Sequence, residues 1–202
     1  MRRKMKKFEL TTEPITNEAG KKLFRIKALI DFGDVKAGEL GGYVEKEGNV
    51  SQDGNAWVYG NAWVFGNAKV TGNAWVCGDA KVCGDAKVCG DAKVYGNAQV
   101  CSNAWVFGNA EVTGNAKVSG NAQVSGNTDY ALAQGFGTKF RCTTFYRGKN
   151  KKIMVNCGCF HGNLEEFRKQ VKETRSGKIA KEYLMIADLM EYHFASEDSR
   201  NE

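Results

Sequence analysis

The chain has 202 residues, a mass of 22.2 kDa, 42% hydrophobic and 26% charged residues, and a formal net charge of +6 at pH 7. This balance excludes a wholly disordered chain, and the positive charge argues against an acidic mimic of DNA. No apolar run approaches the roughly 18 residues of a membrane span, and the basic start leads into Phe8-Glu9-Leu10 rather than an apolar signal segment. We therefore expect a cytoplasmic protein whose seven cysteines are reduced thiols.

Residues 1–47 are predicted to form an N-terminal β cap. Residues 7–10 and 23–30 alternate apolar and polar side chains, and Asn17-Glu18-Ala19-Gly20 lies between them, which is typical of a β-hairpin. The stretches 41–44 and 48–50 predict an irregular first coil of the repeat that follows. We expect the hairpin to cover the open end of that repeat, where strand edges would otherwise remain unpaired.

Residues 48–131 contain a repeat with a period of six. From Gly54 to Ser125 the chain reads as twelve consecutive hexads of the form Gly-Asn/Asp-Ala-x-Val-x, with Ser102 as the one replacement of the glycine. A glycine at every sixth position excludes a helix. The alternation Ala-x-Val-x predicts a short strand, and Gly-Asn or Gly-Asp supplies a turn that needs positive φ. The sequence therefore predicts a mainly β fold built around a solenoid.

The pattern V-x-G-[ND]-A-x resembles the hexapeptide repeat of left-handed parallel β-helix proteins. That resemblance implies triangular coils of three hexads, about four coils in all, with every Ala and Val pointing inward. Val58, Val76, Val94 and Val112 would then stack in one column, and the Asn and Asp residues of the turns would line up along the stack.

The outward positions of the hexads carry the aromatic residues. All four Trp residues stand directly before a Val, so we expect them to face solvent, and exposed aromatic surface is typical of a partner or subunit interface. Ladder packing or cover by a terminal domain is the alternative. Sorted by coil, the candidate partner-binding residues are Trp57, Tyr59, Trp75 and Tyr95 on one face, Trp63 on the second, and Trp105 and Phe107 on the third.

Catalysis is not expected. The acyltransferases that share this type of repeat carry a catalytic His and a loop between coils, whereas these hexads run without interruption and contain no His. Only His161 and His193 are present, both after the repeat. We therefore predict no catalytic residue and no cofactor.

Residues 132–202 predict a small ββαα domain. Residues 140–146 and 153–157 alternate as a hairpin, and Asn163 with Glu166 forms a capping box for the first of two helices. Gly177 separates the helices. The apolar faces are predicted to hold Leu164, Phe167 and Val171 on the first helix and Ile179, Tyr183, Ile186, Met190 and Phe194 on the second.

Two clusters in this domain suggest ligands. Cys142, Cys157, Cys159 and His161 raise a zinc hypothesis, but their spacing fits no standard finger and we predict no metal site. The basic residues are candidates for anion, nucleotide or nucleic-acid binding, with Phe145 or Tyr146 stacking on a base between subunits; a solvated surface is the alternative. These candidates are Arg141, Arg147, Lys149, Lys151 and Lys152.

The flanks carry a second resemblance. The leader KKFELTTEPI…LFRIKALIDFGDVKAGELGGYVEKEGNVSQDGNAWV and the closing GCFHGNLEEFRKQVKET…AKEYL resemble a family of uncharacterised phage and prophage proteins. This implies a phage origin and a bacterial host cytoplasm, but no established activity. We therefore expect a non-catalytic interaction protein, for example an inhibitor of a host defence system such as CRISPR-Cas that occludes a protein surface. We also expect a homo-oligomer, dimer or trimer, and no membrane partner.

Overall fold

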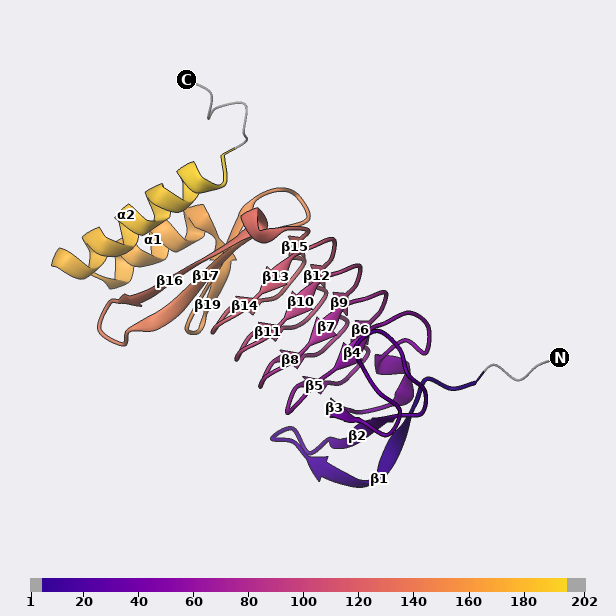
Figure 1. Ribbon diagram of the computed structural model, residues 1–202. Coiled ribbons are helices and arrows are strands. Elements are labelled where there is room, and N and C mark those ends of the chain that lie inside the picture. Colours follow the sequence, from indigo (N-terminus) through magenta and orange to yellow (C-terminus); the bar gives the residue numbers. More distant parts are fainter. Residues whose placement is uncertain (1–4, 196–202) are drawn as a thin grey trace.

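The computed structural model describes residues 5–195 and confirms the expected fold class. A parallel β-solenoid of about five turns forms the centre of the molecule. A β-hairpin lies at its N-terminal end, and a sheet with two helices lies at its C-terminal end (Figure 1). Neither helix in the described part of the chain combines the length and apolar character needed to cross a membrane.

The solenoid contains one two-residue strand from each hexad. Each strand pairs in parallel and in register with the strand one coil further on, so Lys93 lies between Trp75 and Glu111. Three faces result: face one is β13-β10-β7-β4, face two contains β5-β8-β11-β14, and face three is β15-β12-β9-β6. The strands are β4 (Trp57–Val58), β5 (Trp63–Val64), β6 (Lys69–Val70), β7 (Trp75–Val76), β8 (Lys81–Val82), β9 (Lys87–Val88), β10 (Lys93–Val94), β11 (Gln99–Val100), β12 (Trp105–Val106), β13 (Glu111–Val112), β14 (Lys117–Val118) and β15 (Gln123–Val124).

The core of the solenoid consists of the hexad Ala and Val side chains. All of them are buried, as the two-residue alternation predicts. Val58 pairs with Val76 and Val76 with Val94, which confirms the expected column. Burying each Val stabilises the fold by roughly 1.5 kcal/mol or more, so the core stabilises the stack coil by coil.

Each turn between strands requires one residue in the left-handed backbone conformation. The glycines that open the hexads have positive φ, for example +71° at Gly90, and Ser102 takes the same conformation with φ of 60°. Beside them the Asn and Asp side chains form ladders: Asn73 donates to Asp91 at 3.0 Å, one coil away. The turn residues are thus aligned as the repeat predicts.

The N-terminal hairpin extends face two rather than only covering its end. Strands β1 (Phe8–Thr16) and β2 (Lys22–Ala28) are antiparallel, and β3 (Leu40–Val44) continues from β2 onto β5 in parallel. With the 3-10 turn η1 (Glu47–Asn49) and the bridge between Val50 and Val70, β3 forms the irregular first coil that the sequence predicts.

Lys7 closes the end of the stack beside this hairpin. Its Nζ atom donates to the carbonyl oxygens of Ala56 at 2.8 Å and Gly54 at 3.2 Å. Burial lowers the pKa of the amine to about 8, and the charge of Asp53 acts in the opposite direction. The lysine thus satisfies main-chain carbonyls that would accept from the N–H groups of a preceding coil inside the stack.

The C-terminal domain has four strands, not the two that the sequence predicts. After the 3-10 turn η2 (Asn127–Asp129), the antiparallel order is β16 (Tyr130–Phe136), β17 (Arg141–Arg147), β18 (Ile153–Cys157) and β19 (Phe160–Asn163). Helices α1 (Leu164–Thr174) and α2 (Gly177–His193) follow. The predicted capping box of α1 is confirmed, because the Asn163 and Glu166 side chains each accept from the other's backbone N–H.

Strand β17 connects the two cores. Tyr146 belongs to the solenoid core, whereas its neighbour Phe145 packs between the sheet and the helices. The Lys117 backbone N–H donates to Thr144 at 2.9 Å, and Asn156 donates to the Lys117 carbonyl at 2.7 Å. One face of the C-terminal sheet therefore closes the last coil and the other carries the helices (Figure 1).

Candidate functional site

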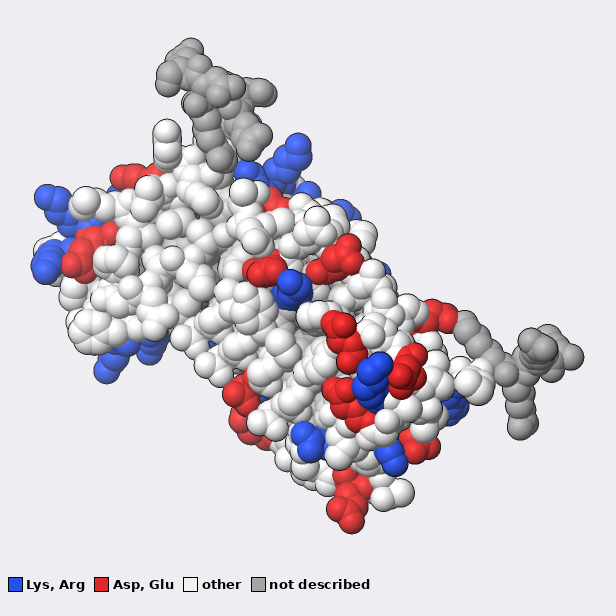
Figure 2. Space-filling view, viewed as in Figure 1, with Lys and Arg blue, Asp and Glu red and all other residues white. Residues whose placement is uncertain are grey.

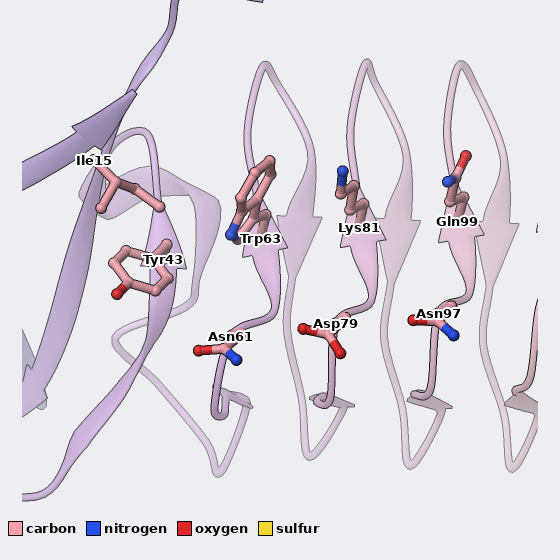
Figure 3. A pocket seen from close by; sticks show the side chains of 8 residues that line it. All are labelled: Ile15, Tyr43, Asn61, Trp63, Asp79, Lys81, Asn97 and Gln99. Atoms are coloured by element: carbon pink, nitrogen blue, oxygen red, sulfur yellow. The ribbon is translucent and has the colours of Figure 1, made fainter. Parts of the chain in front are cut away.

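A groove of about 520 Å³ lies along face two, beside the N-terminal hairpin (Figure 3). Its first row of side chains begins with Ile15 of β1, Tyr43 of β3 and Trp63 of β5. The row continues with Lys81 and Gln99 on the next two coils. An apolar wall at the hairpin thus passes into a polar floor further along the solenoid.

A second row of polar side chains runs beside the first. It contains Asn61, Asp79 and Asn97, one from each successive turn (Figure 3). The repeat predicts that turn residues align, but these three were not among the candidate binding residues. The signal was the 18-residue spacing itself, which brings them to one edge once face two is identified.

Charge contacts hold the floor of the groove. The Nζ atom of Lys81 lies 4.4 Å from the centre of the Trp63 ring, which is a cation–π contact. The same amine lies 3.8 Å from the carboxylate of Glu18 in the hairpin turn. Trp63 is half-buried and lines the groove.

Face one carries a ladder of mutually packed side chains. The rings of Tyr59 and Trp75 meet edge to face at 5.8 Å, and Lys93 lies 5.8 Å from the Trp75 ring. Lys93 also pairs with Glu111 at 2.9 Å, and the Tyr95 hydroxyl donates to Glu111 at 3.2 Å. These hydrogen bonds lower the pKa of the Glu111 carboxyl. The aromatic residues of this face are therefore half-buried by one another.

Trp57 is the exception, and its prediction as an exposed partner-binding residue is wrong. The side chain is completely buried, with the ring of Phe8 at 5.8 Å and that of Phe32 at 5.2 Å, both edge to face. The outward position before Val58 points away from the solenoid core, but the N-terminal segment covers it. Trp57 thus joins the cap to the solenoid.

Face three holds the most exposed of the indoles. Trp105 is 40% exposed and packs on Phe107, with 4.7 Å between the ring centres. Its indole N–H donates to the Cys89 sulfur at 3.0 Å. The remaining six candidates are thus distributed over three faces and do not form one continuous surface.

The five predicted anion-binding residues do not converge within the chain. Arg147 pairs with Asp129 at 3.2 Å and donates to the carbonyl of Phe194 at 2.7 Å, so it joins the end of α2 to the turn before β16. Arg141 lies at the opposite end of β17. The predicted stacking residues Phe145 and Tyr146 are completely buried and cannot receive a base.

The lysines of this set lie in the turn between β17 and β18. This turn is exposed, and its backbone continues the last coil, because the N–H of Lys149 donates to the carbonyl of Asn121 at 3.0 Å. Lys151 and Lys152 extend from the same turn into solvent. The turn therefore has a structural role, and its lysines lie apart from Arg141.

One pair of cysteines differs from the expectation that all seven are reduced thiols. Cys83 and Cys101 lie one coil apart on face two, with 4.7 Å between their Cα atoms, and are joined in a disulfide. The other five are free thiols. Residues 5–195 contain no cluster of three or more His, Cys, Asp or Glu side chains placed to hold a metal ion. His161 instead lies 3.1 Å from the Tyr146 hydroxyl.

Comparison of the sequence with models of protein families finds no match, and comparison with curated proteins finds none either.

The burial of Trp57 predicts a large effect on stability. Trp57→Ala should lower the free energy of unfolding by about 3–5 kcal/mol, because it leaves a cavity between the cap and the solenoid. Trp105→Ala is the matched control and should change it by less than about 1 kcal/mol. Urea unfolding followed by circular dichroism measures both. Equal losses for the two variants would contradict the assignment of Trp57 to the core.

Proposed function

We propose that this protein is a non-catalytic interaction protein that binds a partner protein along face two. The observation that supports this most directly is the groove of about 520 Å³ between the hairpin and the solenoid. Its apolar wall contains Tyr43 and Trp63, and its floor and edge are polar. Aromatic anchors beside a polar rim are characteristic of protein–protein interfaces.

The shape of the groove favours a protein over a small molecule. Small-molecule sites are enclosed and mostly apolar, whereas these side chains stand on the flat outer face of a sheet (Figure 3). The rigid solenoid holds them in rows, so little ordering is needed on binding. Lys81 and Asp79 contribute one charge of each sign, which suits a partner surface of mixed polarity.

Two observations support a role without catalysis. The hexads contain no His, so the base used by acyltransferases with this type of repeat is not present in the solenoid. His161 lies at the junction with the C-terminal domain, against the Tyr146 hydroxyl. This placement is explained by the packing of the last coil.

The proposal has a narrower form that rests on the phage-like flanks alone. In it the partner is a component of a bacterial defence system, CRISPR-Cas being one example, and the protein acts in the host cytoplasm by occluding the partner's surface. In this form the groove remains the proposed docking face, and the phage-like flanks support a host component as the partner.

A capture experiment with matched Trp variants tests the docking face. The tagged protein is incubated with bacterial lysate, and bound proteins are identified by mass spectrometry. Trp63→Ala should weaken binding of the specific partner by at least about tenfold. The reason is that an aromatic anchor in a groove contributes roughly 2 kcal/mol or more of binding free energy. Trp105→Ala removes the same side chain from face three and should retain the partner.

Two results would count against the groove. Either both variants retain the partner equally, or only Trp105→Ala loses it, which would move the docking face to face three. Circular dichroism of both variants controls for folding.

We also propose a homo-oligomer, dimer or trimer, and the outer side of α2 supports it. Met185, Leu189 and Tyr192 lie three and four residues apart and are 61%, 58% and 70% exposed. Such spacing places them along one side of the helix, and a contiguous apolar stripe of this kind is typical of a subunit interface.

Light scattering measures this assembly. Dilute protein should have a mass of at least twice 22.2 kDa. Leu189→Glu should reduce the mass to that of a monomer, because a carboxylate in an apolar interface is unfavourable. A monomeric wild-type protein at micromolar concentration would contradict the proposal.

A further inference from the structure

A small basic cavity lies at the end of the C-terminal domain farthest from Arg147. It is enclosed by the turn between β16 and β17, the turn between β18 and β19, and the junction of α1 with α2. Its volume is about 100 Å³, well below the roughly 300 Å³ of a site for a drug-sized ligand. Lys139, Arg141 and Arg175 line it, and none of its lining residues is a carboxylate.

Two glycines allow the lining groups to approach the backbone. The guanidinium of Arg141 lies against Gly158, which has a φ of +63°, and a Cβ there would overlap it. Tyr183 of α2 lies in the same way against Gly137, which has a φ of +68°. Its hydroxyl is 3.4 Å from the carbonyl oxygen of Phe136. The two turns thus bring side chains from β17 and α2 into one cavity.

Five of the six carboxylates on the two neighbouring helices are used elsewhere, and the sixth, Glu165, does not line the cavity. Each of the four on the outer faces pairs with a cation outside the cavity, and Glu166 caps α1. The pairs are Glu173 with Lys169 at 3.9 Å, Glu182 with Lys178 at 3.6 Å, and Asp188 and Glu191 with Arg168 at 2.7 Å.

The three cations of the cavity are therefore left without internal compensation. Arg175 donates to the adjacent carbonyl of Thr174 at 3.0 Å, but within residues 5–195 no carboxylate pairs with it, Lys139 or Arg141. Arg147, on the same strand as Arg141, has such a partner in Asp129. Lys and Arg side chains fringe this end of the molecule (Figure 2). Repulsion between like charges that line one cavity is unfavourable, and a bound anion would offset it.

We propose that this cavity binds a phosphate group, either as inorganic phosphate or as a small phosphomonoester. Arg141 and Arg175 hold its oxygens through their planar N–H pairs, which match the geometry of phosphate. Lys139 adds a third charge at the rim. The Tyr183 hydroxyl gives up its long hydrogen bond to the Phe136 carbonyl, 3.4 Å in length, and donates to a further oxygen of the phosphate. The small volume holds the phosphate itself and leaves any ester group in solvent.

The ionisation of Tyr183 is consistent with a donor role. Burial raises the pKa of its phenol, the neighbouring Cys157 acts in the same direction, and the charges of Arg175 and Arg141 lower it. Both arginines and Tyr183 line the same cavity. With its pKa above the ordinary value, the hydroxyl keeps its proton at neutral pH and can donate it in a hydrogen bond.

Titration calorimetry of the full chain at low salt tests this proposal. Inorganic phosphate, glycerol phosphate and acetate are the three probes. Phosphate or glycerol phosphate should bind with a Kd of about 1 mM or tighter, and acetate should bind at least about tenfold more weakly because it carries one charge. Tighter binding of glycerol phosphate would assign the site to a monoester, and tighter binding of phosphate would assign it to the free ion.

Charge-neutralising variants locate the site. Arg141→Gln and Arg175→Gln should each weaken binding at least about tenfold, because each removes a charge-assisted pair of hydrogen bonds. Lys169→Gln and Lys178→Gln neutralise cations on the same two helices and should leave binding unchanged. All four positions are exposed, so the variants should fold. No binding of either phosphate by about 10 mM, equal binding of acetate, or equal losses in all four variants would overturn the proposal.

Discussion

The structure depends on the close stacking of identical backbone turns from one coil to the next. Each turn needs positive φ, and the coils approach so closely that a Cβ at Gly90 would lie 3.0 Å from the carbonyl oxygen of Gly108. Glycine therefore recurs in the hexads, Ala and Val fill the interior, and only two positions in six remain free to vary. Those two positions form the faces, so the same constraint that builds the fold also arranges the aromatic candidates of the hexads in rows.

A stack of this kind needs both ends closed, and the two flanking regions do so with different chemistry. At the first coil Trp57 packs among Phe8 and Phe32, and Lys7 binds main-chain carbonyls. At the last coil Tyr146 enters the core and Thr144 accepts from the Lys117 backbone. Charged side chains of both signs gather on the N-terminal cap (Figure 2). The groove lies where the N-terminal hairpin meets the solenoid, and the basic cavity lies where the turns of the C-terminal sheet meet the two helices.

The period of six determines much of this arrangement, so the strands, the Val columns and the three faces could be predicted from the sequence. Features that depend on contacts between distant segments could not. Trp57 has the same local pattern as Trp63, and only the fold of residues 8–35 buries one and leaves the other at a groove. Arg147 and Arg141 likewise lie only six residues apart in the sequence, but strand β17 places them at opposite ends, where one pairs with Asp129 and the other lines the cavity. Strand β16 could not be predicted because its sequence YALAQGF mixes small, polar and apolar residues without a clear two-residue period, and β19 because it has only four residues.

Turn stacking at positive φ determines the fold, and one substitution in each of two turn columns tests this. Gly90→Ala should lower the free energy of unfolding by about 2 kcal/mol, because Ala is strained at positive φ and its Cβ meets the next coil. Ser102→Gly removes the strain of the one non-glycine residue at this turn position. It should raise the free energy of unfolding by up to about 1 kcal/mol. Urea unfolding of the two variants beside the wild type measures both. An unchanged stability of Gly90→Ala, or a loss in Ser102→Gly, would contradict the account.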